Sequence, residues 1–307
     1  MTGRAGFSLL AWAGWQLQMP DDWRPLKLSG TPAKGWMMVG DAECAMFSIH
    51  WERPKAGALL DGQSWVAGRL RRHGVLPDGA PPAAEYFSAC SWARGVQTEE
   101  DKQTTYWYGY AAPAELLLGL KINGVLPQAQ LAQVTKRVLP TLRTSPADAP
   151  STWAMYDLSF VAPPGFQLEK RHLFAGDVAL EFRRGRRESL MLRQVYPGDL
   201  ALGRRSYERW LAAYPFKQHR RLRSSGQKVE PWQEGLRQGV TGMLRRGRKR
   251  LGFPLGGLAP RWTSALAVHD QRLNRLLIAE HMATEETDGS VCAEAIGGMN
   301  QPWQEGC

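Results

Sequence analysis

The chain of 307 residues is 43% hydrophobic with 13 Trp and carries a formal net charge of +10. This composition excludes a disordered chain, and the length suits two domains of about 100–150 residues each. The charge is uneven, because residues 1–150 hold 15 Lys and Arg against 13 Asp and Glu, whereas residues 151–307 hold 24 against 16, which predicts an anionic partner for the second half.

Targeting signals are weak in this sequence. No apolar run approaches the roughly 20 residues that a membrane-spanning helix needs, so we expect no membrane span. Residues 1–13 combine Arg4 with an apolar run but are shorter than an export signal, and a first strand or an unstructured start is the favoured interpretation. The cysteines are scattered without a CxxC pair, which indicates a reducing compartment and a cytoplasmic location: Cys44, Cys90, Cys292 and Cys307.

A pattern in residues 15–54 recurs in residues 158–197. Each copy begins with a short alternating strand that ends at a proline, and an aromatic residue follows three positions later. These positions are Trp15, Leu17, Met19, Pro20 and Trp23 in the first copy, and Leu158, Phe160, Ala162, Pro163 and Phe166 in the second. Further strand-like runs and a helix with an inward-facing tryptophan come next in both copies, at Trp65 and Trp210. The recurrence predicts two similar domains.

The first half continues with a predicted hairpin at residues 36–39 and 44–51, joined by a Gly-Asp turn. Alternation in its second arm assigns Phe47, Ile49 and Trp51 to the core and leaves His50 at the surface. The remaining predicted elements are a helix from Asp61 to a glycine at 74, strands at 85–90, 95–98, 104–111 and 116–122, and a helix from Pro127 that Pro140 distorts.

Three tyrosines, Tyr106, Tyr108 and Tyr110, alternate along the strand predicted at residues 104–111 and therefore share one of its faces. They either pack beneath a helix with their hydroxyls at the rim, or form an aromatic surface for a partner. We retain both interpretations and treat the three tyrosines as candidate partner-binding residues.

Residues 144–152 (TSPADAPST) have the composition of a linker. We therefore expect a first domain at residues 1–145, a linker at 146–152 and a second domain at 153–307. The second domain repeats the order of the first. Its predicted elements are strands at 157–161, 166–170, 178–183 and 189–196, a helix capped by Ser206, a meander at 216–223, 230–238 and 240–245, a long loop through 245–260, strands at 262–269 and 274–282, and a closing helix from Asp288.

The opening strands at residues 15–23 and 158–166, and the order of strands, helix, meander and closing helix, resemble the PsbP-like fold. Extrinsic photosystem subunits and a Ran-binding nuclear import factor share that fold. The resemblance implies a tandem duplication of an α+β domain, with each antiparallel sheet packed against helices. It also implies a binding or adaptor module, although fold does not fix function. No functional motif of the family matches, so none of its site residues carry over.

Enzyme motifs do not occur in the sequence. It has no GxSxG elbow, no Gly-rich phosphate loop ending in Lys-Ser or Lys-Thr, no GxGxxG after a strand and no HExxH. The histidines are dispersed, so we predict neither a metal nor a cofactor: His50, His73, His172, His219, His269 and His281. Because a catalytic triad is defined by geometry, an enzyme of unrecognised class remains a third hypothesis.

Clusters of arginine are the strongest functional signal, and we expect them in turns or loops that share one patch of the second domain. A guanidinium suits phosphate and carboxylate groups, although a charge run is often only a solvated face. The leading hypothesis is a non-catalytic adaptor for a protein partner or another anionic macromolecule, and the alternative is a nucleic-acid or ribosome-associated factor. The candidate anion-binding residues are Arg184, Arg186, Arg187, Arg220, Arg221, Arg245, Arg246, Arg248, Lys249 and Arg250.

Overall fold

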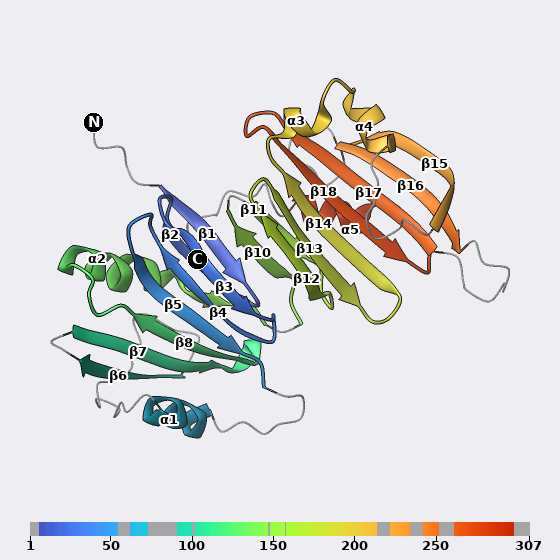
Figure 1. The fold of residues 1–307 in the computed structure, drawn as a ribbon. Helices are drawn as coiled ribbons and strands as arrows, with labels where there is room; N and C mark the ends of the chain where they lie inside the picture. The colour runs from blue at the N-terminus through green and yellow to red at the C-terminus, as the bar shows by residue number, and fades with distance from the viewer. Residues whose placement is uncertain are drawn as a thin grey trace. The chain divides into compact units, whose positions relative to one another are not determined.

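A computed structural model describes residues 6–54, 62–72, 91–99, 102–146, 148–156, 158–213, 222–233, 242–251 and 261–297. The chain divides into two units, Met1–Ser159 (unit 1) and Phe160–Cys307 (unit 2). The division falls inside the strand β11 (Leu158–Ala162), later than the predicted linker. Figure 1 shows the elements of each unit.

The predicted α+β fold class, with each sheet packed against helices, is wrong. In the described residues, antiparallel strands form three sheets of five, six and seven strands, and the helices are few and short. The helix predicted from Pro127 illustrates the reason. It forms only α2 (Gln128–Gln133), a π-helical turn η2 (Val134–Val138) and a 3-10 turn η3 (Leu139–Thr141), because Pro140 cannot continue an α-helix. None of the described helices is long and apolar enough to cross a membrane.

The six-stranded sheet of unit 1 has the order β3-β4-β5-β8-β7-β6. In β5, Phe47, Ile49 and Trp51 are buried and His50 is exposed, as the alternation predicts. The sequence analysis missed β3, whose largely exposed residues show little apolar alternation. The strands are β3 (Arg24–Gly30), β4 (Lys34–Gly40), β5 (Ala45–Glu52), β6 (Ser91–Glu99), β7 (Lys102–Ala111) and β8 (Leu116–Ile122).

The second sheet of unit 1 has the order β11-β10-β1-β2-β9 and packs on one face of the first through tryptophan contacts. The ring centroids of Trp15 in β2 and Trp51 in β5 are 6.1 Å apart. Trp23, in the turn between β2 and β3, adds a contact with Phe47 of β5, with ring centroids 6.4 Å apart. The predicted linker at residues 146–152 follows β9 and overlaps the start of β10 at residues 151 and 152. The additional strands are β1 (Phe7–Trp12), β2 (Trp15–Pro20), β9 (Arg143–Thr144) and β10 (Ser151–Met155).

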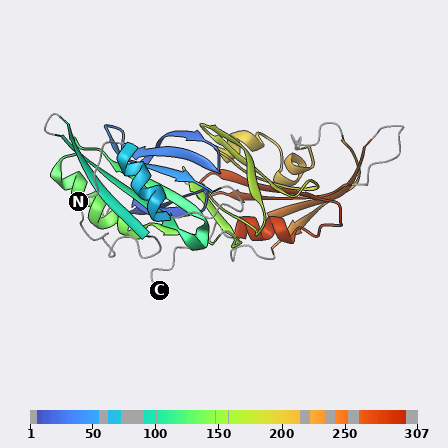
Figure 2. The ribbon, with the colours of Figure 1, turned by 90° about the horizontal axis from the view of Figure 1, so that it is seen from below.

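The helix α1 (Gly62–Arg72) lies against the opposite face of the six-stranded sheet (Figure 2). Its buried residues Val66 and Leu70 pack against Tyr106 and Tyr108 of β7, and Trp65 is half-buried beside them. This contact fixes the position of the helix over β7.

The seven-stranded sheet of unit 2 has the order β12-β13-β14-β18-β17-β16-β15. This order matches that of the six-stranded sheet, with β15 as one additional edge strand. The turn before each sheet is also the same, because the Trp23 amide donates to the Pro20 carbonyl (2.9 Å) and the Phe166 amide to the Pro163 carbonyl (3.3 Å). The strands are β12 (Gln167–Phe174), β13 (Asp177–Arg184), β14 (Glu188–Val195), β15 (Leu222–Trp232), β16 (Gly242–Leu251), β17 (Arg261–Asp270) and β18 (Arg275–Ala283).

Short helices lie on both faces of this sheet (Figure 2). Trp210 and Leu211 of α4 (Tyr207–Ala213), together with Leu202 of α3 (Gly198–Leu202), pack against Ala265 and other alternate residues of β17 and β18. The helix α5 (Ser290–Gly297) lies on the opposite face, where the Cys292 thiol is 3.6 Å from the hydroxyl of Ser264.

The loop predicted for residues 245–250 is wrong, because the whole basic tract belongs to β16. This strand pairs with β15 on one side and β17 on the other, so its backbone is satisfied on both edges. Of the meander strands predicted at 230–238 and 240–245, residues 230–232 lie in β15 and 242–245 in β16, and residues 234–241 lie outside the described residues. The sequence pattern failed here because a run of charges is typical of solvated loops, whereas this run is interior to the strand order.

Candidate functional sites

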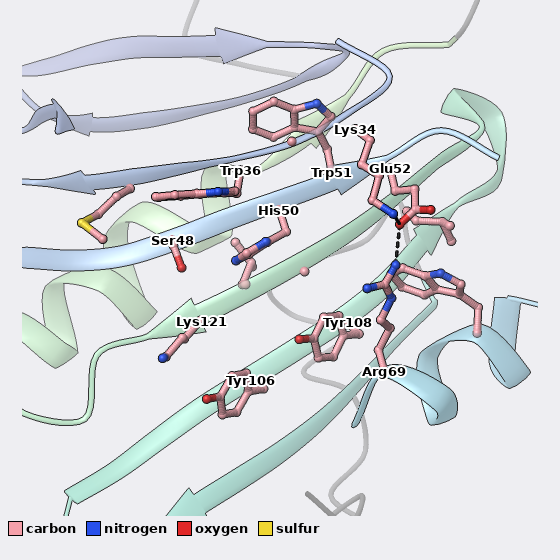
Figure 3. Close-up of a pocket in the computed structure, with 16 residues that line it drawn as sticks. Lys34, Trp36, Ser48, His50, Trp51, Glu52, Arg69, Tyr106, Tyr108 and Lys121 are labelled. Atoms are coloured by element: carbon pink, nitrogen blue, oxygen red, sulfur yellow. Dashed lines mark hydrogen bonds and ion pairs between the residues drawn. The ribbon is translucent and has the colours of Figure 1, made fainter. Parts of the chain in front are cut away.

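An aromatic groove of about 510 Å³ opens on the face of the six-stranded sheet next to α1 (Figure 3). Both β4 and β5 contribute to it, as do β7, β8 and α1. Its aromatic residues come from four of these elements, and a lysine of β8 lies on the same face. We define the aromatic groove by Trp36, His50, Trp65, Tyr106, Tyr108 and Lys121.

One row of paired residues forms the floor of the groove. Trp36 pairs with His50, His50 with Gly119, and Gly119 with Tyr108, so the row crosses β4, β5, β8 and β7. A Cβ atom at Gly119 would lie 2.6 Å from Cε1 of Tyr108. The Tyr108 ring therefore occupies the space that a side chain at position 119 would need. The rings of Trp36 and His50 stack, with centroids 6.3 Å apart and an interplanar angle of 27°.

Charged groups line the wall of the groove. The Glu52 carboxylate accepts from the Lys34 ammonium (3.1 Å) and from the Arg69 guanidinium. The Arg69 guanidinium also lies 5.1 Å from the ring centroid of Trp65, whose edge meets Tyr108 at 6.0 Å. These contacts hold Trp65 and Arg69 against the sheet.

Lys121 supplies a further cation, and its ammonium lies 5.7 Å from the ring centroid of Tyr106. In the described part of the chain, no carboxylate forms an ion pair with Lys121, whereas Glu52 already pairs with Lys34 and Arg69. Glu52 is also the one carboxylate among the described residues that line the groove. The groove therefore carries an excess of positive charge.

The three predicted tyrosines have different environments. Tyr106 and Tyr108 are buried beneath α1, which is the packing arrangement that the sequence left open, yet both reach the groove (Figure 3). Tyr110 is half-buried. Burial raises the pKa of Tyr108 to about 12, against the opposing effect of Arg69. The Tyr108 hydroxyl therefore keeps its proton at neutral pH.

A second candidate site lies at one end of the seven-stranded sheet, where basic residues of several strands gather. The β13–β14 turn holds Arg184, Arg186 and Arg187, with Gly185 at a φ of 63°. Strand register places Arg248 at the same end of the sheet. Arg248 pairs with Trp262, and Trp262 pairs with Ala283. Ala283 follows the residue of β18 that pairs with the start of β14. Four strand spacings separate β13 from β16, about 19 Å in total. We define the basic end by Arg184, Arg186, Arg187, Arg223, Arg248, Lys249, Arg250 and Arg261.

Arg184 anchors the β13–β14 turn. Its guanidinium donates two hydrogen bonds of 2.7 Å to the Glu188 carboxylate and lies 4.7 Å from the Phe166 ring centroid. Glu188 is also 2.7 Å from Nε2 of the buried His281. Arg186 and Arg187 are exposed beyond this network, beside a hollow of about 480 Å³ that Glu285 also lines.

Burial opposes ionisation of both acidic and basic members of this network. Burial lowers the pKa of His281, although Glu188 opposes that effect. For Glu188, hydrogen bonds from Arg184 and His281 outweigh burial, so its pKa is lowered. A neutral imidazole next to an ionised carboxylate is the arrangement that these shifts favour near neutral pH.

The other predicted basic residues are distributed differently. Arg245 is half-buried and donates to the Leu211 carbonyl of α4 (3.2 Å), so it faces the core of unit 2 rather than a shared patch. Arg246 pairs with Glu230 of β15. Arg248, Lys249 and Arg250 are placed by strand register alone. Arg220 and Arg221 lie outside the described residues, as does the strand predicted at 85–90.

The sequence analysis missed most of the aromatic groove and the Glu188–His281 pair. Alternation did place His50 on the exposed face of β5, and Lys121 interrupts an otherwise apolar strand. Neither signal reveals which strands are neighbours. Glu188 and His281 are 93 positions apart, and only the β14–β18 pairing brings them together.

Comparisons with known proteins give little. No family model matches the sequence, and no curated protein does. A solved structure from Bacteroides thetaiotaomicron is similar over 47% of this chain and 49% of its own, with 14% sequence identity and a TM-score of 0.27. The chain thus spans about half the length of that protein. A likeness this low carries no argument about fold or function, and the resemblance to the PsbP-like fold remains a prediction.

Proposed function

We propose that this chain is a non-catalytic adaptor built from two related units, and that the basic end of unit 2 binds an acidic protein surface. The observation that carries the proposal is the gathering of basic residues from β13, β15, β16 and β17 at one end of one sheet. The shared strand order of the two larger sheets supports a common origin of the units.

The construction of the β13–β14 turn suits binding. The Arg184 guanidinium bonds to Glu188 and contacts the Phe166 ring, and these contacts fix the turn. Arg186 and Arg187 are exposed at the tip of the turn. A guanidinium held on a rigid turn loses less conformational entropy on pairing with a carboxylate than one on a mobile segment.

The choice between an acidic protein and a nucleic acid rests on the carboxylates at the same site. Glu285 lines the hollow beside Arg186 and Arg187, and the exposed Glu286 follows it. A phosphate backbone carries negative charge at every nucleotide and would be repelled there, whereas a protein surface can place a cation or a gap opposite these groups. Nucleic-acid binding is the second candidate, because arginine forks also fit phosphate.

A double charge reversal tests the proposal. Arg186→Glu with Arg187→Glu should weaken binding of a fluorescently labelled acidic peptide, in which serine alternates with glutamate, by about tenfold or more, measured by anisotropy. Stability should change by only about half a kcal/mol per site, because both residues are exposed.

The matched control is Arg204→Glu with Arg205→Glu. These exposed residues follow α3. Asp199 of α3 bonds to Asn274, which lies at the opposite end of the sheet from the basic end. Reversal of Arg204 and Arg205 changes the net charge of the protein by the same amount as the Arg186/Arg187 reversal. If both double variants weaken peptide binding equally, the binding reflects general electrostatic attraction and not a site at the basic end. Tighter binding of a labelled nucleic-acid duplex, with steep salt dependence and loss in the Arg186/Arg187 variant, would favour the second candidate instead.

A further inference from the structure

We propose that the aromatic groove of unit 1 binds a planar organic anion, of the class of aromatic carboxylates, with the anionic group at Lys121 and the ring on the row formed by Trp36, His50, Gly119 and Tyr108. This inference is independent of the basic end, since it concerns other residues in another unit. The volume of the aromatic groove, about 510 Å³, falls in the range of small-molecule sites.

The shape of the floor argues for a flat ligand. Gly119 has no side chain, so the Tyr108 ring lies over it at the centre of the row, and His50 comes next on the other side. Trp36 extends the row by stacking on His50 at 27°. The row crosses four strands, or three spacings of about 4.8 Å, so it spans roughly 14 Å, enough for one or two fused rings. Aromatic side chains bind such rings by offset stacking or edge contacts.

The charge of the groove argues for an anion. Lys34 and Arg69 share the single carboxylate Glu52, and Lys121 contributes a further positive charge. The Lys121 ammonium lies over Tyr106 and is exposed, so it can turn toward a bound carboxylate with little desolvation. A charge-assisted hydrogen bond of this kind selects an anion over a neutral molecule of the same shape.

The wall is built to stay in place while a ligand exchanges. The contacts of Arg69 with Glu52 and Trp65, and of Trp65 with Tyr108, hold one side of the groove through pairs that do not involve Lys121. The Tyr108 hydroxyl remains a hydrogen-bond donor through the neutral pH range.

The test uses 2-naphthoate and its neutral analogue 2-naphthamide as probes with the full chain, and binding is measured by calorimetry and by ligand-observed NMR. Naphthoate should bind at least about tenfold more tightly than naphthamide, because only the acid offers a carboxylate to Lys121. Lys121→Gln should remove this preference and leave naphthamide binding unchanged. The matched control is Lys136→Gln, an exposed lysine in η2 outside the groove, which should leave both affinities unchanged.

Three results would overturn the proposal. Equal binding of the acid and the amide would show a merely apolar surface, and an unchanged preference in the Lys121→Gln variant would place the anion elsewhere. The third is absence of naphthoate binding at millimolar concentration in the unaltered chain. The Arg186→Glu, Arg187→Glu variant separates this proposal from the proposed function, because it should lose binding of the acidic peptide and retain binding of naphthoate.

Discussion

Gly119 gives the sharpest test of the groove's construction, through the substitution Gly119→Ala. The added Cβ would lie 2.6 Å from Cε1 and 2.9 Å from Cδ1 of Tyr108, and both distances are too short for carbon atoms in contact. Tyr108 cannot simply withdraw, because Trp65 and the buried face of α1 pack against it. The substitution must therefore shift either the ring or the strand.

The expected magnitude comes from two opposing effects. Overpacking a filled site typically costs about 1–3 kcal/mol. Replacing glycine by alanine also restricts the unfolded chain, which stabilises the folded state by about 0.4–1 kcal/mol. We therefore expect Gly119→Ala to lower the free energy of unfolding of unit 1 by about 1–2 kcal/mol, which corresponds to about 2–4 °C in Tm per kcal/mol for a domain of this size.

Gly68→Ala is the matched control, because it is the same chemical change in the same unit. Gly68 lies inside α1, and a Cβ there would meet nothing within 4 Å. Alanine should therefore stabilise the helix by up to about 1 kcal/mol, the opposite sign. Thermal unfolding followed by near-UV circular dichroism measures both variants. A shift of both in the same direction, or Gly119→Ala equal to the parent, would refute the assigned position of the Tyr108 ring.

Two further predictions concern the tryptophans of α4 and α1, and the buried His281 of unit 2. Trp210→Ala should lower the free energy of unfolding by about 3–5 kcal/mol in urea titrations, because Trp210 is 5% exposed. Trp65→Ala should lower it by only about 1–2 kcal/mol, because Trp65 is half-buried. Equal losses in the two variants would contradict the difference in burial. The lowered pKa of His281 means that the unfolded state binds the extra proton first, so stability is complete above the ordinary value of 6.5 and falls as the pH drops below it. The urea midpoint should therefore decrease from pH 7.5 to about 5.5, and His281→Gln should reduce that decrease; an unchanged decrease would place its origin in other groups.

The sequence predicted single strands well and their neighbours poorly. Alternation identified the buried and exposed faces of β5, and the apolar spacing located α1 and α4, because both signals are local in the chain. The basic tract of β16 led to the incorrect prediction of a loop at residues 245–250. Arg245 bonds to a carbonyl 34 residues away and Arg246 to a carboxylate 16 residues away, so two charges that suggest a solvated loop are held by distant partners. Such compensation is invisible to local patterning.

The two units differ in how helices cover the larger sheet. In the strand order, β7 and β8 of unit 1 correspond to β17 and β18 of unit 2. In unit 2, Leu202 of α3 joins Trp210 and Leu211 over Ala265 and Ile278. The same face also carries Arg245 and the buried Glu280, because both pair with Ala265.

The corresponding face of unit 1 is arranged differently in the described residues. There α1 packs over Tyr106 and Tyr108, while β5 and β8 present His50, Gly119 and Lys121 beside it. Lys121 opposes burial of this face beneath a helix, because burying its charge without a partner would cost more than the added contact gains. In unit 2, by contrast, the Arg245 guanidinium beneath α4 donates to the Leu211 carbonyl. The groove of unit 1 therefore persists beside α1 because Lys121, which the ligand proposal assigns to anion recognition, keeps this part of the face accessible to solvent.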